Sequence, residues 1–251
     1  MDNHVFAAVL GLAMAAAPIA AVQAAELKVI AGGGMTAPLK ELGPQFERAT
    51  GHKVDIAFAA TPELIKMATS GNPMDLAVVP VNVMQDAGAR ARFAPEPTID
   101  IARVGFGVAV KAGATKPDVS TPDALKQTLL KTQSIAFLPA SAAGAYVMKV
   151  FDRLGVKEQM MAKTRAQKTP GDIPKAVANG EAELGIFLTN VLIAPGVELA
   201  GSFPGDLQND LVFTAAVATE SKEKTAARAF LDFLKTPEAV AVIKAKGMQP
   251  G

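Results

Sequence analysis

The fold is decided by the stretch LKVIAGGGMTAPLKELGPQFERATGHKVDIAFAATPELIKMATSGNPMDLAVV, residues 27–79. Three short runs of mainly apolar residues in it predict strands: Leu27–Ala31, Val54–Ala59 and Asp75–Val79. The segments between them predict two helices, Ala37–Thr50 and Thr61–Ser70, each followed by a glycine. We expect Thr61 to cap the second helix, with Pro62 at its first helical position. Repeated strand–helix units of this length predict a parallel sheet with helices on both faces.

The rest of the chain continues the alternation. A loop is expected at Arg92–Pro97, followed by a bent apolar strand at Ile101–Lys111. Four further strands are predicted: Ser134–Leu138, Glu183–Phe187, Gly196–Ser202 and Leu211–Thr219. One helix is predicted to begin after a cap at Ser120 or Thr121, and another to follow the small-residue loop Pro139–Gly144. Three more helices are predicted at Pro174–Ala178, Lys222–Leu234 and Pro237–Ala245.

This pattern predicts two α/β lobes. The first lobe is expected to contain residues 25–104 and the returning segment 214–251, and the second lobe residues 105–213. The crossovers are expected near Asp100–Gly107 and Gly205–Thr214. A single open sheet is the alternative.

The composition excludes several classes of function. Lys plus Arg number 25 against 24 Asp plus Glu, so no strong field attracts nucleic acid or an anionic membrane. The 251 residues include no Cys and two His, which excludes disulfides, thiol nucleophiles and zinc sites built on Cys or several His. We expect no metal, no cofactor and no nucleic-acid partner.

The N-terminus has the pattern of a secretory signal peptide, residues 1–24. After MDNH comes an apolar run interrupted by Pro18, and Val22-Gln23-Ala24 ends it as a small-residue cleavage site. The segment before the run lacks Lys and Arg, and a membrane anchor is the alternative. Cleavage would leave Ala25 as the first residue of a periplasmic protein.

Four loops lie at the same place, after a predicted strand and at the start of a helix: Gly32–Thr36, Ala60–Glu63, Ala140–Gly144 and Leu188–Asn190. Ligands of α/β sheets bind at the carboxyl ends of the strands, and helix N-termini there suit anions. We therefore predict an anion site made by Gly33, Gly34, Met35, Thr36, Thr61, Ser141, Ala142, Gly144, Tyr146, Leu188 and Thr189.

Each of these features also has an ordinary structural interpretation. The glycines at 32–34 suit a plain strand–helix turn, and Tyr146 is as compatible with the core as with a ligand contact. His52 follows a helix-ending glycine and is expected to be exposed. Asp75 could reach the cleft or hold a turn.

The chain resembles the periplasmic molybdate-binding-protein-like branch of the type II solute-binding proteins. The similarity rests on VIAGGGMTAPLKEL at Val29–Leu42, FAATPELIKMATSGNPMDLAVV at Phe58–Val79, PASAAGAYVMKVFDRLG at Pro139–Gly155, AVANGEAELGIFLTNVL at Ala176–Leu192 and AFLDFLKTPEA at Ala229–Ala239. The resemblance implies a type II periplasmic binding protein fold: two lobes, each a mixed sheet flanked by helices, that close on a small anion in the cleft between them. It also implies delivery of that anion to the permease of an ABC transporter.

The loops depart from the molybdate binders where the resemblance places ligand contacts. A serine of the first loop is Gly34 here, a serine-rich run becomes Ala60-Thr61-Pro62, and a tyrosine after the Gly185-Ile186 strand is Leu188. Each donor missing around a desolvated oxyanion costs about 1–3 kcal/mol. These departures disfavour molybdate.

The segment AGATKPDVSTPDALKQTLLKTQSIAF, Ala112–Phe137, is similar to the periplasmic aconitate isomerases. That family has an acid before the serine of the small-residue loop, where this chain has Ala140. The resemblance implies an organic di- or tricarboxylate as ligand. An allylic proton transfer would need an acid and a base, and the candidates are Glu63, Asp75, Tyr146 and His52.

From the residues and both resemblances, we expect a monomeric periplasmic receptor that captures an organic di- or tricarboxylate for an ABC importer without turning it over. The alternatives are an aconitate-type isomerase on the same scaffold and a molybdate or tungstate receptor.

Overall fold

The computed structural model describes residues 24–251, apart from the side chains of residues 95–97. The predicted signal peptide, residues 1–24, lies outside the described part except for its last residue. Within residues 24–251, none of the helices combines the length and apolarity that crossing a membrane requires.

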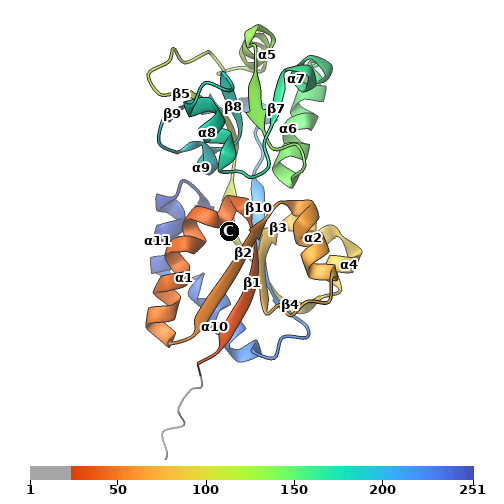
Figure 1. Cartoon of the computed structure of the whole chain (residues 1–251), viewed down its shortest axis with the longest axis vertical. Coiled ribbons are helices and arrows are strands. Elements are labelled where there is room, and N and C mark those ends of the chain that lie inside the picture. Colours follow the sequence, from red (N-terminus) through yellow and green to blue (C-terminus); the bar gives the residue numbers. More distant parts are fainter. Residues whose placement is uncertain (1–23) are drawn as a thin grey trace, which may run out of the picture.

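The chain forms two bodies, each built on its own sheet (Figure 1). We call the body on the six-stranded sheet lobe 1. Its strand order is β11-β4-β10-β3-β1-β2, in which β1 runs parallel to β2 and β3, and β10 runs antiparallel to β3 and β4. The strands are β1 Glu26–Gly32, β2 Lys53–Ala59, β3 Leu76–Pro80, β4 Phe93–Val104, β10 Leu211–Ala218 and β11 Gln249–Pro250.

We call the body on the five-stranded sheet lobe 2, and its order is β7-β6-β8-β5-β9. Here β6 is parallel to β7 and β8, whereas β5 is antiparallel to β8 and β9. The strands are β5 Phe106–Lys111, β6 Ile135–Phe137, β7 Thr164–Ala166, β8 Leu184–Leu188 and β9 Val197–Ser202. Two mixed sheets flanked by helices confirm the predicted fold class, and the alternative of a single open sheet was wrong.

Helices flank both sheets. Those of lobe 1 are α1 Thr36–Thr50, α2 Thr61–Thr69, α3 Val81–Gln85, α4 Ala87–Arg90, α10 Lys224–Phe233 and α11 Pro237–Ala245. Those of lobe 2 are α5 Pro122–Lys131, α6 Ala142–Arg153, α7 Lys157–Lys163, α8 Asp172–Ala178 and α9 Thr189–Leu192. Two single-turn 3-10 helices occupy Gly33–Met35 and Gly205–Leu207. Leu39, Leu42 and Phe46, which lie on one face of α1, are fully buried.

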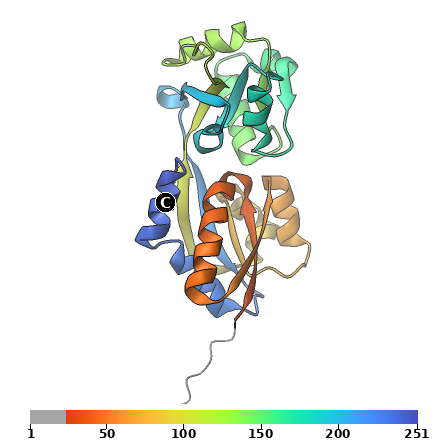
Figure 2. The same cartoon turned by 60° about the vertical axis from the view of Figure 1, so that its left-hand side comes forward.

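The chain passes between the sheets along two neighbouring segments, which Figure 2 shows to the left of the contact between the lobes. One is the single residue Gly105 between β4 and β5, and the other joins β9 to β10. The Gln208 side chain links them: its Oε1 accepts from the Phe106 N–H at 2.8 Å, and its Nε2 donates to the Phe106 carbonyl at 2.9 Å. A Cβ at position 105 would lie 3.0 Å from the Gln208 amide, so glycine leaves room for this link.

The prediction of a loop at Arg92–Pro97 is wrong, because strand β4 already begins at Phe93. Two prolines made this segment resemble a loop. Phe93 pairs with Ala218 and Thr98 pairs with Ala216, with a register shift between the two pairs. An irregular strand pairing of this kind tolerates prolines because it does not need every backbone N–H.

Candidate functional site

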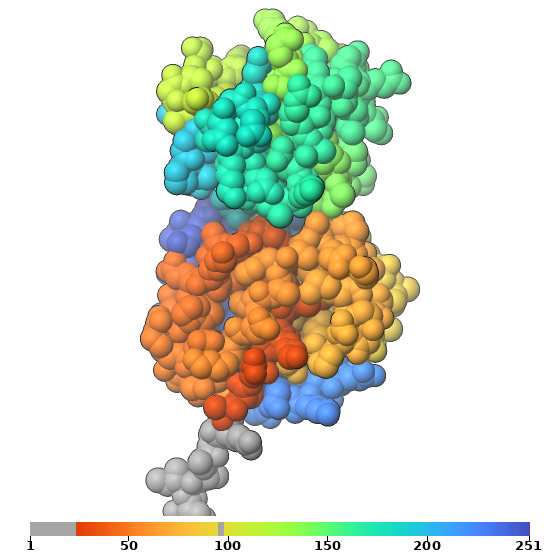
Figure 3. Space-filling model, in the orientation of Figure 1, coloured from red at the N-terminus to blue at the C-terminus, as the bar shows by residue number. Residues whose placement is uncertain are grey.

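The predicted anion loops do meet. The carboxyl ends of β1 and β2 in lobe 1 face those of β6 and β8 in lobe 2, and Figure 3 shows the two lobes in contact there. Between them lies a pocket of about 20 Å³, which we call the junction pocket. It is lined by residues of these loops and by the strands behind them: Gly33, Gly34, Ala59, Ala60, Thr61, Pro80, Leu138, Ser141, Ala142, Ala143, Pro170, Phe187, Leu188, Leu211 and Phe213. This volume holds about one water molecule.

The hydroxyls of the junction pocket already have partners within the chain. Ser141 Oγ caps α6 by accepting from the Gly144 N–H at 2.9 Å, and it donates to the Leu138 carbonyl at 2.8 Å. Thr61 Oγ1 accepts from the Ala142 N–H at 3.0 Å, a bond that joins the two lobes. The cap of α2 is Ala60, so the expectation that Thr61 caps this helix was wrong. Thr61 is its first helical residue and bonds across the junction instead.

Apolar side chains fill the rest of the junction pocket. A Cβ built on Gly34 would lie 2.7 Å from Phe213 Cζ and 3.0 Å from Leu188 Cδ1. A Cβ on Gly33 would lie 2.7 Å from Pro170 Cγ. These glycines are therefore required for the lobes to approach, and a serine at position 34 has no room in this arrangement.

A much larger groove opens beside the junction pocket, with a volume of about 1000 Å³. The two cavities adjoin, because they share the lining residues Gly33, Gly34, Ala59, Ala60 and Pro170. Most of the groove is lined by carbon-rich side chains: Ala37, Phe58, Ala59, Ala60, Pro170, Pro174, Val191, Ile193, Ala194 and Pro195. Its charged lining residues are Lys40, Glu63, Lys168 and Lys175, and we call it the lysine groove.

The lysines come from both lobes. Lys40 belongs to α1 of lobe 1, Lys168 precedes α8 of lobe 2, and Lys175 lies on α8. Lys175 Nζ is 3.6 Å from Asp172 Oδ1, whereas Lys40 and Lys168 have no described carboxylate within 4.0 Å. Sequence reasoning missed all three, because Lys40 lies 128 residues before Lys168 in the chain and the lysines show no common pattern until the lobes bring them to one groove.

Other predicted residues have structural partners. Thr36 lines the groove, but its Oγ1 donates to the Gly33 carbonyl at 2.7 Å. Met35 is fully buried in the core of lobe 1. Thr189 donates its N–H to the Gly105 carbonyl at 2.9 Å, which places it at the crossover.

Tyr146 lines a different cavity, of about 260 Å³, together with Lys149, Asn209 and Asp210. Its hydroxyl donates to the Leu207 carbonyl at 3.0 Å, and its ring centroid is 4.7 Å from that of Phe106. Burial raises the pKa of the Tyr146 phenol. This cavity also lies between the lobes, because Asn82 and Gln85 of α3 line it, but Tyr146 lines neither the junction pocket nor the lysine groove.

Two of the acid–base candidates are structural. His52 is buried, not exposed as expected, because its ring stacks on Phe46 with centroids 5.9 Å apart and its Nδ1 accepts from the Ala25 N–H at 3.1 Å. Asp75 is also buried and accepts from the Ser221 hydroxyl at 2.6 Å and the Lys28 N–H at 2.8 Å. It precedes β3, at the opposite end of that strand from the junction. Only Glu63 of the four candidates lines the lysine groove.

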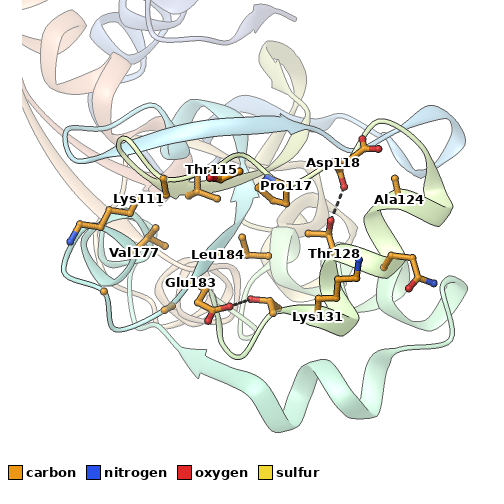
Figure 4. Close-up of a pocket in the computed structure, with 16 residues that line it drawn as sticks. Lys111, Thr115, Pro117, Asp118, Ala124, Thr128, Lys131, Val177, Glu183 and Leu184 are labelled. Atoms are coloured by element: carbon orange, nitrogen blue, oxygen red, sulfur yellow. Dashed lines mark hydrogen bonds between the residues drawn. The ribbon is translucent and has the colours of Figure 1, made fainter.

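A further cavity of about 720 Å³ lies within lobe 2, between α5 and the segment after β5 (Figure 4). Its polar groups bond one another: Thr128 Oγ1 donates to the Asp118 carbonyl at 2.7 Å, and Glu183 Oε2 accepts from Thr132 Oγ1 at 2.7 Å. The backbone N–H of Gln133 and then the Thr132 hydroxyl lower the pKa of Glu183. These bonds hold the lobe together.

Among residues 24–251, no group of three His, Asp or Glu side chains is placed to hold a metal ion.

Comparison with known proteins agrees with this architecture. The chain is 34% identical over 248 residues to an aconitate isomerase of Pseudomonas sp, covering 95% of this chain and 94% of that protein. It is 32% identical over 238 residues to the molybdate-binding protein ModA of Azotobacter vinelandii, covering 90% and 91%. The solved structure of the Azotobacter vinelandii periplasmic molybdate-binding protein superposes with a TM-score of 0.75 at 23% identity, covering 88% of this chain and 98% of that one.

Residues 27–249 match the family described as bacterial extracellular solute-binding protein. The match spans both sheets and every loop that contributes to the junction pocket and the lysine groove. The resemblance identified from the sequence is thereby confirmed, and this chain belongs to the bacterial extracellular solute-binding protein family.

Proposed function

We propose that this chain is the periplasmic receptor of an ABC importer and that it captures an organic anion with two or three carboxylates. Export would use residues 1–24 as signal peptide, and the captured anion would pass to the permease. The observation that carries the choice of ligand is the lysine groove, where a carbon-lined cavity is flanked by cations from both lobes.

Lysines on opposite lobes suit a ligand with several carboxylates. One carboxylate can pair with Lys40 on lobe 1 while another pairs with Lys168 on lobe 2, and such a ligand holds the lobes together. Each pair contributes little while exposed to water, about 0.2–1 kcal/mol, and more once closure excludes water. The apolar lining between the cations suits the carbon skeleton that joins the carboxylates.

A tetrahedral oxyanion finds less support. The junction pocket, where the molybdate-binder resemblance places the anion, has room for about one water. The Ser141 hydroxyl is used within the chain, and Thr61 already holds the Ala142 N–H. Leu188 and Phe213 face Gly34 with carbon atoms, and Pro170 has no N–H to offer.

The proposal is tested by thermal melts and calorimetric titrations of residues 25–251 against citrate, tricarballylate, succinate, sulfate and molybdate. A ligand at about 100 times its Kd adds about 2.7 kcal/mol to the free energy of unfolding, so the carboxylates should raise Tm by several degrees. A rise with molybdate alone would refute the proposal.

Matched charge variants locate the site. Lys40→Gln with Lys168→Gln should weaken polycarboxylate binding strongly. Lys126→Gln with Lys222→Gln removes the same charge away from the groove and should leave binding nearly unchanged. Equal losses in both double variants would show that net charge, not the groove, attracts the anion.

A second function is supported by the 34% identity to aconitate isomerase and by Glu63, a carboxylate in the groove. Isomerisation of trans-aconitate to the cis form needs a base to remove a proton from the allylic CH2 and an acid to return one to the carbon at the other end of the allylic system, so that the double bond moves. Chromatography of trans-aconitate incubated with the protein tests this. Turnover that Glu63→Gln abolishes would support the enzyme, and no turnover would exclude it.

A further inference from the structure

Asn190 is a buried side chain that bonds across the contact between the lobes. It belongs to α9 of lobe 2, is 8% exposed and lines the lysine groove. Its Nδ2 donates to the Gly34 carbonyl of lobe 1 at 2.8 Å. A second part of lobe 1 also covers it, since a Cβ built at Gly247 would lie 3.6 Å from the Asn190 Cα.

The other half of this amide has no partner. Asn190 Oδ1 is buried and accepts no hydrogen bond from any of the described residues. Its orientation is fixed, because the Gly34 carbonyl only accepts, and rotating the amide would place two oxygens against each other. Buried acceptors in folded proteins are nearly always paired. This oxygen therefore calls for a donor from outside the chain.

We propose that Asn190 Oδ1 accepts a hydrogen bond from a hydroxyl of the bound anion, so that the receptor selects hydroxylated di- and tricarboxylates. This inference rests on the proposed function, because the lysines would bind the carboxylates. Lysines alone do not distinguish a hydroxylated skeleton from a bare one, whereas a buried acceptor does. The oxygen is buried in this arrangement, so the donor has to enter before the lobes close and is then enclosed beside Asn190.

Citrate and tricarballylate test the inference, because they have the same three carboxylates and differ by one hydroxyl. Both are titrated calorimetrically into residues 25–251 at slightly alkaline pH, in buffer without divalent cations. We expect citrate to bind about 5- to 100-fold more tightly, the usual range for pairing a buried acceptor. Malate should exceed succinate in the same direction.

Variants then assign the discrimination to the amide. Asn190→Leu removes both the acceptor and the bond to Gly34, so it should weaken both ligands but bring the citrate to tricarballylate ratio close to one. Thr61→Val removes a different bond between the lobes and should weaken both ligands while the ratio stays at its wild-type value.

Each outcome decides the question. Equal binding of citrate and tricarballylate by the wild-type protein overturns the inference and leaves the proposed function intact, since it means a water satisfies Oδ1. A ratio that survives Asn190→Leu also overturns it. Failure of every carboxylate to bind overturns the proposed function and the inference with it.

Discussion

Replacing Gly34 by serine restores the residue that the molybdate-binder resemblance places in the first loop, and it tests whether this chain has given up that site. The added Cβ would lie 2.7 Å from Phe213 Cζ and 3.0 Å from Leu188 Cδ1, both below an ordinary carbon contact. Phe213 and Leu188 are 1% exposed, so their surroundings restrict how far they can move. Overpacking of this kind costs about 1–3 kcal/mol.

The expected result is a lower Tm without any gain of molybdate binding. For a chain of this size each kcal/mol shifts Tm by about 2–4 °C, so Gly34→Ser should lower it by several degrees. Calorimetric melts measure the shift, and titration with molybdate measures binding. Adding Leu188→Ala removes one of the two clashes, so it should recover part of the strain while creating a small cavity.

Gly171→Ser is the matched control, because a Cβ there meets nothing within 4 Å. It should leave Tm within about a degree of wild type, as surface substitutions usually do. A Gly34→Ser protein that melts like the control, or that binds molybdate tightly, would refute the claim that the junction pocket is closed to a side chain and to an oxyanion.

Three further predictions follow from buried or bonded groups. Asp75→Ala leaves the Ser221 hydroxyl and a backbone N–H unpaired inside lobe 1, so urea titration should show a loss of about 1–3 kcal/mol. The pKa of Glu183 is lowered below 4.5 by a backbone and a hydroxyl hydrogen bond; the group stabilises the fold above that pH and loses this contribution as pH falls through its folded-state pKa. Glu183→Gln should therefore make the decline of Tm below pH 4.5 shallower, and an unchanged decline would contradict the assignment. Tyr146→Phe loses the bond to the Leu207 carbonyl, so it should cost about 0.5–1.5 kcal/mol of stability and leave carboxylate affinity unchanged.

The sequence was sufficient for most of the longer elements and for where the loops meet, but it did not predict the short elements α3, α4, α7, β7 and β11. The position of each loop after a predicted strand correctly indicated which loops line the junction pocket. It was insufficient where an outcome depends on packing across the chain. His52 is buried because the N-terminal strand reaches its ring. Thr61 bonds the other lobe instead of its own helix. The lysine groove exists only once Lys40 and Lys168 face one cavity.

The amide of Gln208 has a consequence for how the lobes can move. It bonds the N–H and the carbonyl of Phe106 at once, while the Phe203 N–H also donates to that carbonyl at 2.9 Å. One connecting segment therefore cannot bend without pulling the other. The two crossovers behave mechanically as a single ribbon, which favours opening and closing about one axis and resists twisting of one lobe against the other. Lys40 on lobe 1 and Lys168 on lobe 2 would then return to the same relative position each time the lobes close.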